Sequence, residues 1–326
     1  MKHRLVAVVL VCALLGTAGS VRGTESEAAA ACDGMRYATQ AGVRIAYSVE
    51  GASSGSPVVL VPGSGQHAGD WPAAFIAGLR QRGFRIVRLD PRDVGCSTHL
   101  ADKGVVDWPR LFGQLSAGAT PETAYTVDDM AKDVLAVMDA EKIPRAHLVG
   151  VSAGATVAGW LAAQRPDRVD AVALLMANSG NPKNTIPADA ARMASAGAPP
   201  APGASPAARR TFLAAMNDAL EAGHPTRTTD ELQAWLDSAS ARPLDADGMA
   251  RTGAALLAAG DLRERFSAIK ARTLVLHGEN DPLIPAAAGR EVAESIPGAR
   301  FLLQPNMGHM LNSAAAQTVI EHLAAK

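Results

Sequence analysis

Residues 146–160 read Ala-His-Leu-Val-Gly-Val-Ser-Ala-Gly-Ala-Thr-Val-Ala-Gly-Trp, and they are the clearest sequence signal of the fold. An apolar run leads into a Gly-x-Ser-x-Gly pattern at Gly150, Ser152 and Gly154, and small helix-forming residues follow it. A strand that turns at a serine directly into a helix holds that serine in a strained, exposed elbow. Side chains at Gly150 and Gly154 would collide with the neighbouring strand and helix. The pattern therefore indicates a nucleophilic Ser152 rather than an ordinary tight turn.

The composition is that of an ordinary globular protein. The chain has 326 residues, 48% of them apolar, and 31 basic side chains stand against 32 acidic ones. Such a chain can bury a large core. The balanced charge gives no reason to expect nucleic acid or an acidic surface as a partner. Aromatic residues make up only 4% of the chain, which argues against a platform for stacking bases or carbohydrate.

The first twenty residues have the pattern of a secretory signal peptide. Lys2 and Arg4 form a basic start, Leu5 to Gly16 is an apolar run, and small residues at 18–20 offer a cleavage site. The run is too short for a comfortable membrane span, although a buried helix or a membrane anchor stays an alternative. We predict a signal peptide at 1–20, cleaved between 20 and 31, an exported protein (periplasmic or secreted), and no stable membrane span after cleavage.

Two cysteines, Cys32 and Cys96, remain once Cys12 has left with the signal peptide. In an oxidising compartment they could form a disulfide. Two unpaired thiols fit the sequence equally well, because a disulfide requires a short distance that the sequence does not show.

Strand and helix patterns alternate along most of the chain after an expected hairpin at 35–49. The other expected strands are Pro57–Val61, Phe84–Leu89, His147–Val151, Val169–Met176, Arg272–His277 and Arg300–Gln304, and the expected helices are 71–82, 126–140, 153–164, 286–295 and 314–325. This alternation predicts a mostly parallel sheet with helices on both faces.

Residues 178–264 interrupt this alternation with Pro- and Ala-rich stretches and no clear strand. The segment also holds several helical patches, of which the clearest are Arg209–Glu221, Thr229–Ala239 and Ala246–Ala259. Ligands of such sheets bind outside the carboxyl ends of the strands, so we expect a lid over the site, and a surface excursion is the alternative. The predicted organisation is a core of residues 35–177 and 265–326 with a helical cap at 178–264.

A nucleophilic serine needs a base, and the base needs an orienting partner. His309 is the favoured base among eight histidines, because it follows the final strand in a loop and stands directly after a glycine. His147 and His277 lie in strand patterns and are expected to serve structure. His67 and His99 lie in loops near strand ends and are minor candidates.

Asp281 is the expected acid, in a turn that follows a strand and ends at Pro282. One helix and one strand separate it from His309, which is the connection that brings two adjacent strand ends together. Glu279 is the rival and is expected to be a solvated turn residue. The acid could instead have followed the strand Val169–Met176, but that position holds Asn178.

The chain order Ser152, Asp281, His309 resembles that of the α/β-hydrolases. Three further motifs resemble the aclacinomycin methylesterase branch of that family: Gly69-Asp70-Trp71-Pro72, the loop of residues 90–98, and Asn280-Asp281-Pro282. The resemblance implies an α/β-hydrolase fold, with a mostly parallel eight-stranded sheet, helices on both faces and a helical lid insertion.

The resemblance also implies an oxyanion hole made by two backbone N–H groups, those of Ser64 and Ala153. Many relatives have His-Gly in the first of these loops, whereas this chain has Pro62-Gly63. The departure removes a histidine, but the amide of Ser64 is retained. Each such donor contributes roughly 3 kcal/mol to stabilising the tetrahedral intermediate.

The activity implied is hydrolysis of a carboxylic ester of a small-molecule acyl substrate by a Ser-His-Asp triad through an acyl-enzyme. Hydrolysis of a lactone, an amide or a C–C bond stays open. A non-catalytic, ligand-binding member of the fold is the alternative from another class. We expect no cofactor and no metal, because no His, Cys and Asp cluster has ligand spacing. Substrate identity and oligomeric state are left open by the sequence.

Overall fold

Eight strands form one sheet in the computed structural model, which describes residues 32–184, 187–201, 203–242 and 244–325. The strands are β1 (Arg36–Gln40), β2 (Val43–Glu50), β3 (Pro57–Val61), β4 (Arg85–Leu89), β5 (Ala146–Val151), β6 (Val169–Leu175), β7 (Arg272–Gly278) and β8 (Arg300–Gln304). Their spatial order is β1-β2-β4-β3-β5-β6-β7-β8. Strand β2 pairs antiparallel with β1 and β4, and all other neighbours are parallel. The predicted sheet is thereby confirmed, whereas the predicted signal peptide lies outside the described residues.

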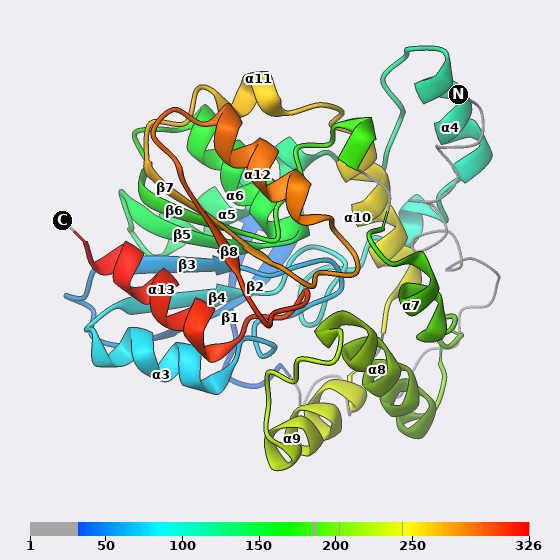
Figure 1. Ribbon diagram of the computed structural model, residues 1–326, viewed down its shortest axis with the longest axis horizontal. Helices are drawn as coiled ribbons and strands as arrows, with labels where there is room; N and C mark the ends of the chain where they lie inside the picture. The colour runs from blue at the N-terminus through cyan, green and yellow to red at the C-terminus, as the bar shows by residue number, and fades with distance from the viewer. Residues whose placement is uncertain (1–31, 185–186, 202, 243, 326) are drawn as a thin grey trace.

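Two groups of helices cover the two faces of the sheet (Figure 1). One face carries α3 (Ala73–Gln81) and α13 (Ser313–Ala324), and the other carries α5 (Val127–Ala140), α6 (Ala153–Gln164) and α12 (Ala286–Ser295). Successive residues of β3 alternate between the two cores: Val58 and Leu60 pack with α3, and Val59 and Val61 pack on the opposite side. Because both faces are covered, the inner strands are apolar at nearly every position.

Four helices lie together at one end of the sheet, and we call them the cap helices (Figure 1). They are α7 (Ala190–Ser195), α8 (Pro206–Glu221), α9 (Thr229–Ser240) and α10 (Ala246–Ala258). The starts of the last three are defined by N-caps at Ser205, Thr228 and Asp245, whose side chains accept a hydrogen bond from the first helical turn. The boundaries predicted for the cap as a domain stay a prediction.

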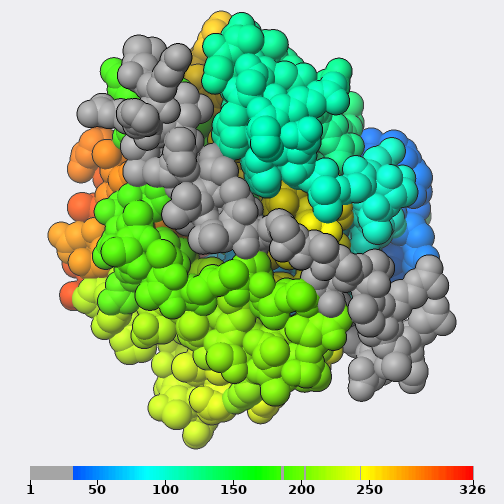
Figure 2. Space-filling model, turned by 90° about the vertical axis from the view of Figure 1, so that its right-hand side faces the viewer, coloured from blue at the N-terminus to red at the C-terminus, as the bar shows by residue number. Residues whose placement is uncertain are grey.

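Short helical segments complete the described chain: η1 (Ala101–Lys103), α4 (Trp108–Ser116), η2 (Pro182–Asn184) and α11 (Arg263–Phe266). Figure 2 shows the face formed by α4 and the cap helices, with atoms of α10 visible in a hollow between them. The sequence patterns did not predict α4 or α7.

A disulfide joins Cys32 to Cys96, with a Cα–Cα distance of 5.6 Å. It ties the first described residue to the loop that follows β4, across a sequence separation of 64 residues. The structure thus selects pairing over the two unpaired thiols that the sequence also allowed.

Removing this disulfide is expected to lower the free energy of unfolding by about 4 kcal/mol, because the unfolded chain gains the entropy of a long open loop. Urea denaturation of the double variant Cys32→Ser, Cys96→Ser measures the loss. A reductant should destabilise the wild-type protein by a similar amount and leave the variant unchanged. Equal stability of the variant and the oxidised wild-type protein would contradict the prediction.

Candidate active site

Ser152 occupies a strained turn between β5 and α6. Its backbone has φ +55° and ψ −119°, in a region that residues other than glycine rarely adopt. A Cβ placed on Gly150 would lie 2.2 Å from the carbonyl oxygen of Gly154, and one on Gly154 would lie 2.1 Å from that of Val61. Both glycines are therefore required by close backbone approach, as the sequence predicted, and the elbow holds Ser152 in place.

Asp281 and His309 meet at the ends of the adjacent strands β7 and β8. The Nδ1 atom of His309 lies 2.7 Å from Oδ2 of Asp281. The other carboxylate oxygen accepts the backbone N–H groups of Leu283 and Ile284, each at 2.9 Å. Both side chains are buried. The geometry agrees with the pairing predicted from the chain order, and the rival Glu279 is exposed.

The carboxyl group of Asp281 is ionised at neutral pH. Burial alone would raise its pKa, but the charge of His309 and hydrogen bonds from His277 and His309 together hold the pKa well below its usual range. An ionised carboxylate only accepts hydrogen bonds, so His309 donates from Nδ1. This arrangement leaves Nε2 of His309 as the proton acceptor.

His277 also holds Asp281, which the sequence did not predict. Its Nε2 lies 3.0 Å from the carbonyl oxygen of Ile284 and 3.3 Å from Oδ2 of Asp281. Both neighbours are acceptors, so the hydrogen of this fully buried ring lies on Nε2. A histidine inside an apolar run gives no signal of such a contact.

The end of helix α8 rests directly on the loop that carries His309. The backbone N–H of His309 donates to the carbonyl oxygen of Leu220 at 2.8 Å. A Cβ on Gly308 would lie 2.2 Å from the same oxygen, so no side chain fits there. One of the cap helices therefore positions the histidine through the backbone.

Replacing Gly308 with alanine is expected to push α8 and the His309 loop apart. We expect a loss of about 1–3 kcal/mol in the free energy of unfolding, as for other overpacked sites, together with a fall in hydrolytic activity. Gly113→Ala in α4 is the matched control, because a Cβ there meets no atom within 4 Å. Urea denaturation and an ester assay measure both effects, and a Gly308→Ala protein as stable and active as the wild type would contradict the contact.

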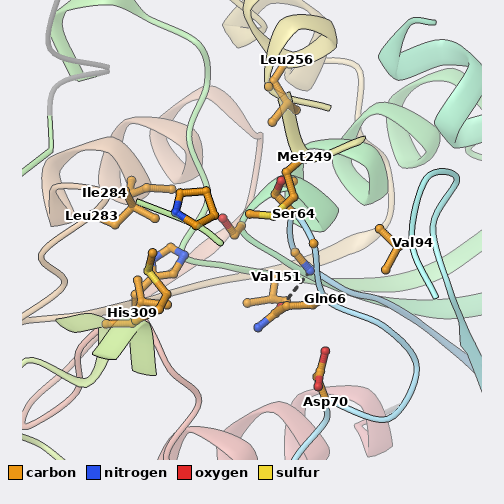
Figure 3. Close-up of a pocket in the computed structure, with 18 of the residues that line it drawn as sticks. Ser64, Gln66, Asp70, Val94, Val151, Met249, Leu256, Leu283, Ile284 and His309 are labelled. Atoms are coloured by element: carbon orange, nitrogen blue, oxygen red, sulfur yellow. Dashed lines mark hydrogen bonds between the residues drawn. The ribbon is translucent and has the colours of Figure 1, made fainter. Parts of the chain in front are cut away.

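Ser64 and Ala153, the residues expected to form the oxyanion hole, line the same cavity as Ser152. Ala153 is the first residue of α6, so its N–H has no acceptor within the helix and lies at the positive end of the helix dipole. The side chain of Gln66 accepts the N–H of Gly63 at 2.9 Å and fixes the loop that carries Ser64 (Figure 3). A single glutamine in a loop carries no sequence signal of this role.

The cavity has a volume of about 640 Å³ and is enclosed largely by apolar side chains of the cap helices. Figure 3 shows His309, Leu283 and Ile284 on one side of it and Met249 and Leu256 of α10 above. Ser152 and His309 both line it, but within the described part of the chain no hydrogen bond joins their side chains. Catalytic hydrogen bonds often form only once a substrate is bound.

The minor histidine candidates have other partners. Nδ1 of His99 lies 2.7 Å from Oδ2 of Asp245, and this hydrogen bond raises the pKa of His99. Asp93, His99 and Asp245 form a group of potential metal ligands. However, both oxygens of Asp93 bind the guanidinium of Arg251, at 2.8 and 2.9 Å. These carboxylates therefore already have a cation as their partner.

The sheet, the serine elbow and the Asp-His pair define the class of α/β-hydrolases. Residues 56–314 match the family described as "alpha/beta hydrolase fold", and the chain belongs to this family. It is a hydrolase. Within the described residues, no helix is both long and apolar enough to cross a membrane.

Individual relatives are hydrolases of several kinds. The chain is 32% identical over 264 residues to the "Putative carbamate hydrolase RutD" of Variovorax paradoxus, covering 81% of this chain and 88% of that one. It is 26% identical over 300 residues to the rhodomycin D methylesterase DnrP of Streptomyces peucetius, with 84% and 92% covered. This similarity confirms the resemblance to the methylesterase branch.

A solved structure, the enol-lactonase from Burkholderia xenovorans, superposes with a TM-score of 0.62 at 27% identity, covering 89% of this chain and 100% of that one. An esterase from a Rhodococcus species superposes with a TM-score of 0.64 at 26% identity, with 89% and 99% covered. The fold predicted from the sequence is thus shared with an enol-lactonase and an esterase.

Proposed function

We propose that this protein is an exported serine hydrolase that cleaves a carboxylic ester of a small molecule through Ser152, His309 and Asp281. One observation carries the proposal: the strained elbow of Ser152 opens onto the same cavity as a histidine whose other nitrogen is held by a buried, ionised aspartate. The methylesterase and esterase relatives support an ester as the substrate.

The proposed reaction has two halves. In the first, the Ser152 oxygen attacks the ester carbonyl carbon while Nε2 of His309 takes the hydroxyl proton, and Asp281 stabilises the imidazolium. The N–H groups of Ser64 and Ala153 stabilise the negative oxygen of the tetrahedral intermediate. The C–O bond to the alcohol then breaks, and His309 gives its proton to the leaving oxygen. In the second half, His309 deprotonates a water molecule that hydrolyses the acyl-enzyme.

A panel of p-nitrophenyl esters of increasing chain length, one aryl amide and one lactone tests the bond that is cleaved. We expect the esters to have the highest kcat/KM, with the amide slower because its leaving group is poorer. The lactone is included because of the enol-lactonase among the structural relatives. A lactone hydrolysed faster than every ester would replace the proposed ester specificity.

Export is proposed from the signal-like first twenty residues and is supported by the Cys32–Cys96 disulfide, since disulfides persist mainly in oxidising compartments. Mass measurement of the N-terminal peptide after expression in a secreting host tests this. We expect the mature chain to begin between residues 21 and 32. An intact Met1 on protein recovered from the cytoplasm would contradict export.

A further inference from the structure

The wall of the cavity contains two arginines whose charges are not neutralised by a carboxylate. Arg209 of α8 and Arg242, which follows α9, both line the cavity. Nε of Arg209 donates to the carbonyl oxygen of Ser240 at 2.8 Å, and Nη1 of Arg242 lies 3.1 Å from Nδ1 of His67. Over the described ranges, neither guanidinium has a carboxylate oxygen within 4 Å.

Two of the acidic side chains that line the cavity already have partners. Asp93 is paired with Arg251, and Asp245 is hydrogen-bonded to His99 and lies 3.6 Å from the same Arg251.

Asp70 is the third acidic side chain of the wall, and its hydrogen-bond donors are neutral. Its oxygens accept the indole N–H of Trp235 and the backbone N–H of His67, both at 2.8 Å. Figure 3 shows Asp70 and Gln66 on the side of the cavity away from Leu283 and Ile284. Asp70 therefore forms no ion pair with Arg209 or Arg242, and both guanidinium groups keep their charge in the wall.

The contact between Arg242 and His67 does not neutralise this charge. Nδ1 of His67 also accepts the N–H of Gly69 at 3.0 Å, so the hydrogen of the ring lies on Nε2. The His67 side chain is 10% exposed, and its Nε2 lies 3.4 Å from Oδ1 of Asp70. Burial lowers the pKa of His67, which keeps the ring neutral.

We propose that the substrate carries a carboxylate that binds Arg242. An apolar segment of the substrate, lying against the cavity wall, separates this carboxylate from the ester bond. Guanidinium and carboxylate groups form paired hydrogen bonds, and a guanidinium facing an apolar cavity is stabilised by such a partner. The spacer between the two groups is a hydrocarbon, because Met193, Phe212, Met216 and Met249 line the cavity. Arg209 adds to the positive field. This inference rests on the proposed esterase activity and names its substrate class, an acidic ester.

The test compares acidic and neutral esters of equal length. The acidic arm uses mono-p-nitrophenyl esters of dicarboxylic acids from succinate to suberate, and the neutral arm uses the same compounds with the free carboxylate methylated. A second acidic arm uses carboxyphenyl esters of simple acids, which place the charge on the alcohol side. The measured quantity is the ratio of kcat/KM for each acidic ester to that for its neutral counterpart.

In the wild-type protein we expect this ratio to exceed about ten at one chain length or in one arm. A tenfold ratio corresponds to the free energy of one charge-assisted hydrogen bond. Arg242→Gln should reduce that ratio towards one, and Arg242→Lys should restore part of it. Arg210→Gln is the matched control: Arg210 lies beside Arg209 on α8 but binds Asp237 and Gln233, and the ratio should be kept.

The outcomes separate this inference from the proposed function. Hydrolysis of the neutral esters without any preference for an acidic one overturns the carboxylate site and leaves the esterase proposal standing. A preference that survives in Arg242→Gln also overturns it. If no ester of either kind is hydrolysed, the proposed function itself has failed. Thermal unfolding of each variant shows whether a lost preference reflects a lost fold.

Discussion

Replacing Ser152 with alanine is expected to lower kcat for p-nitrophenyl esters by about a million-fold, the size found when a nucleophile that acts within a triad is removed. No other group at the elbow can form the acyl bond. Alanine keeps the Cβ, so the strain at φ +55° is the same in both proteins and the fold should be retained. Steady-state kinetics with purified protein, together with circular dichroism, measure the two properties separately.

A Ser152→Ala protein with near wild-type turnover would remove Ser152 from the mechanism. A wild-type protein that binds esters without hydrolysing any of them would favour the non-catalytic alternative that the sequence left open. The elbow would then be a structural feature only.

Replacing Asp281 with asparagine is expected to lower kcat by about ten-thousandfold, as in other triads in which the acid becomes an amide. The asparagine amide can donate to Nδ1 of His309, which moves the imidazole hydrogen to Nε2. His309 then has no free nitrogen to take the proton of Ser152. The binding of neutral esters depends on the cavity wall, so KM should change far less than kcat.

Glu279→Gln is the control for this variant, because Glu279 stands two residues earlier in the same turn and is exposed. We expect its kcat to lie within about twofold of the wild-type value, since surface substitutions have small effects. Equal activities of the Asp281→Asn and Glu279→Gln proteins would place the acid elsewhere. Both variants should be measured at the same pH.

The parts of the fold that the sequence predicted well are those with local causes. Helix α6 begins and ends at the predicted residues, because the elbow and the small residues after it lie in one stretch. The inner strands matched within about two residues, because strands covered on both faces are apolar throughout. Helix α4 was missed although its apolar residues Trp108, Leu111, Phe112 and Leu115 have the spacing of one helix face.

The sequence predicted which catalytic side chains meet, but not the contacts that hold them in position. The turn after β7 and the Gly-His loop after β8 predicted that Asp281 and His309 meet, since adjacent parallel strands end at one edge. The contact between His309 and Leu220 depends on how the cap helices fold back over the sheet. The hydrogen bond from His277 to the carbonyl oxygen of Ile284 depends on how the backbone turns between these two residues. Neither contact corresponds to a sequence pattern from which it could be predicted.

Covalent labelling with a fluorophosphonate, followed by mass spectrometry of the intact protein and of its peptides, tests the activated serine most directly. We expect one adduct per chain on the peptide that contains Ser152, no adduct in Ser152→Ala, and much slower labelling in Asp281→Asn. An unlabelled Ser152 in a protein that still hydrolyses esters, or an adduct on a different residue, would contradict the account.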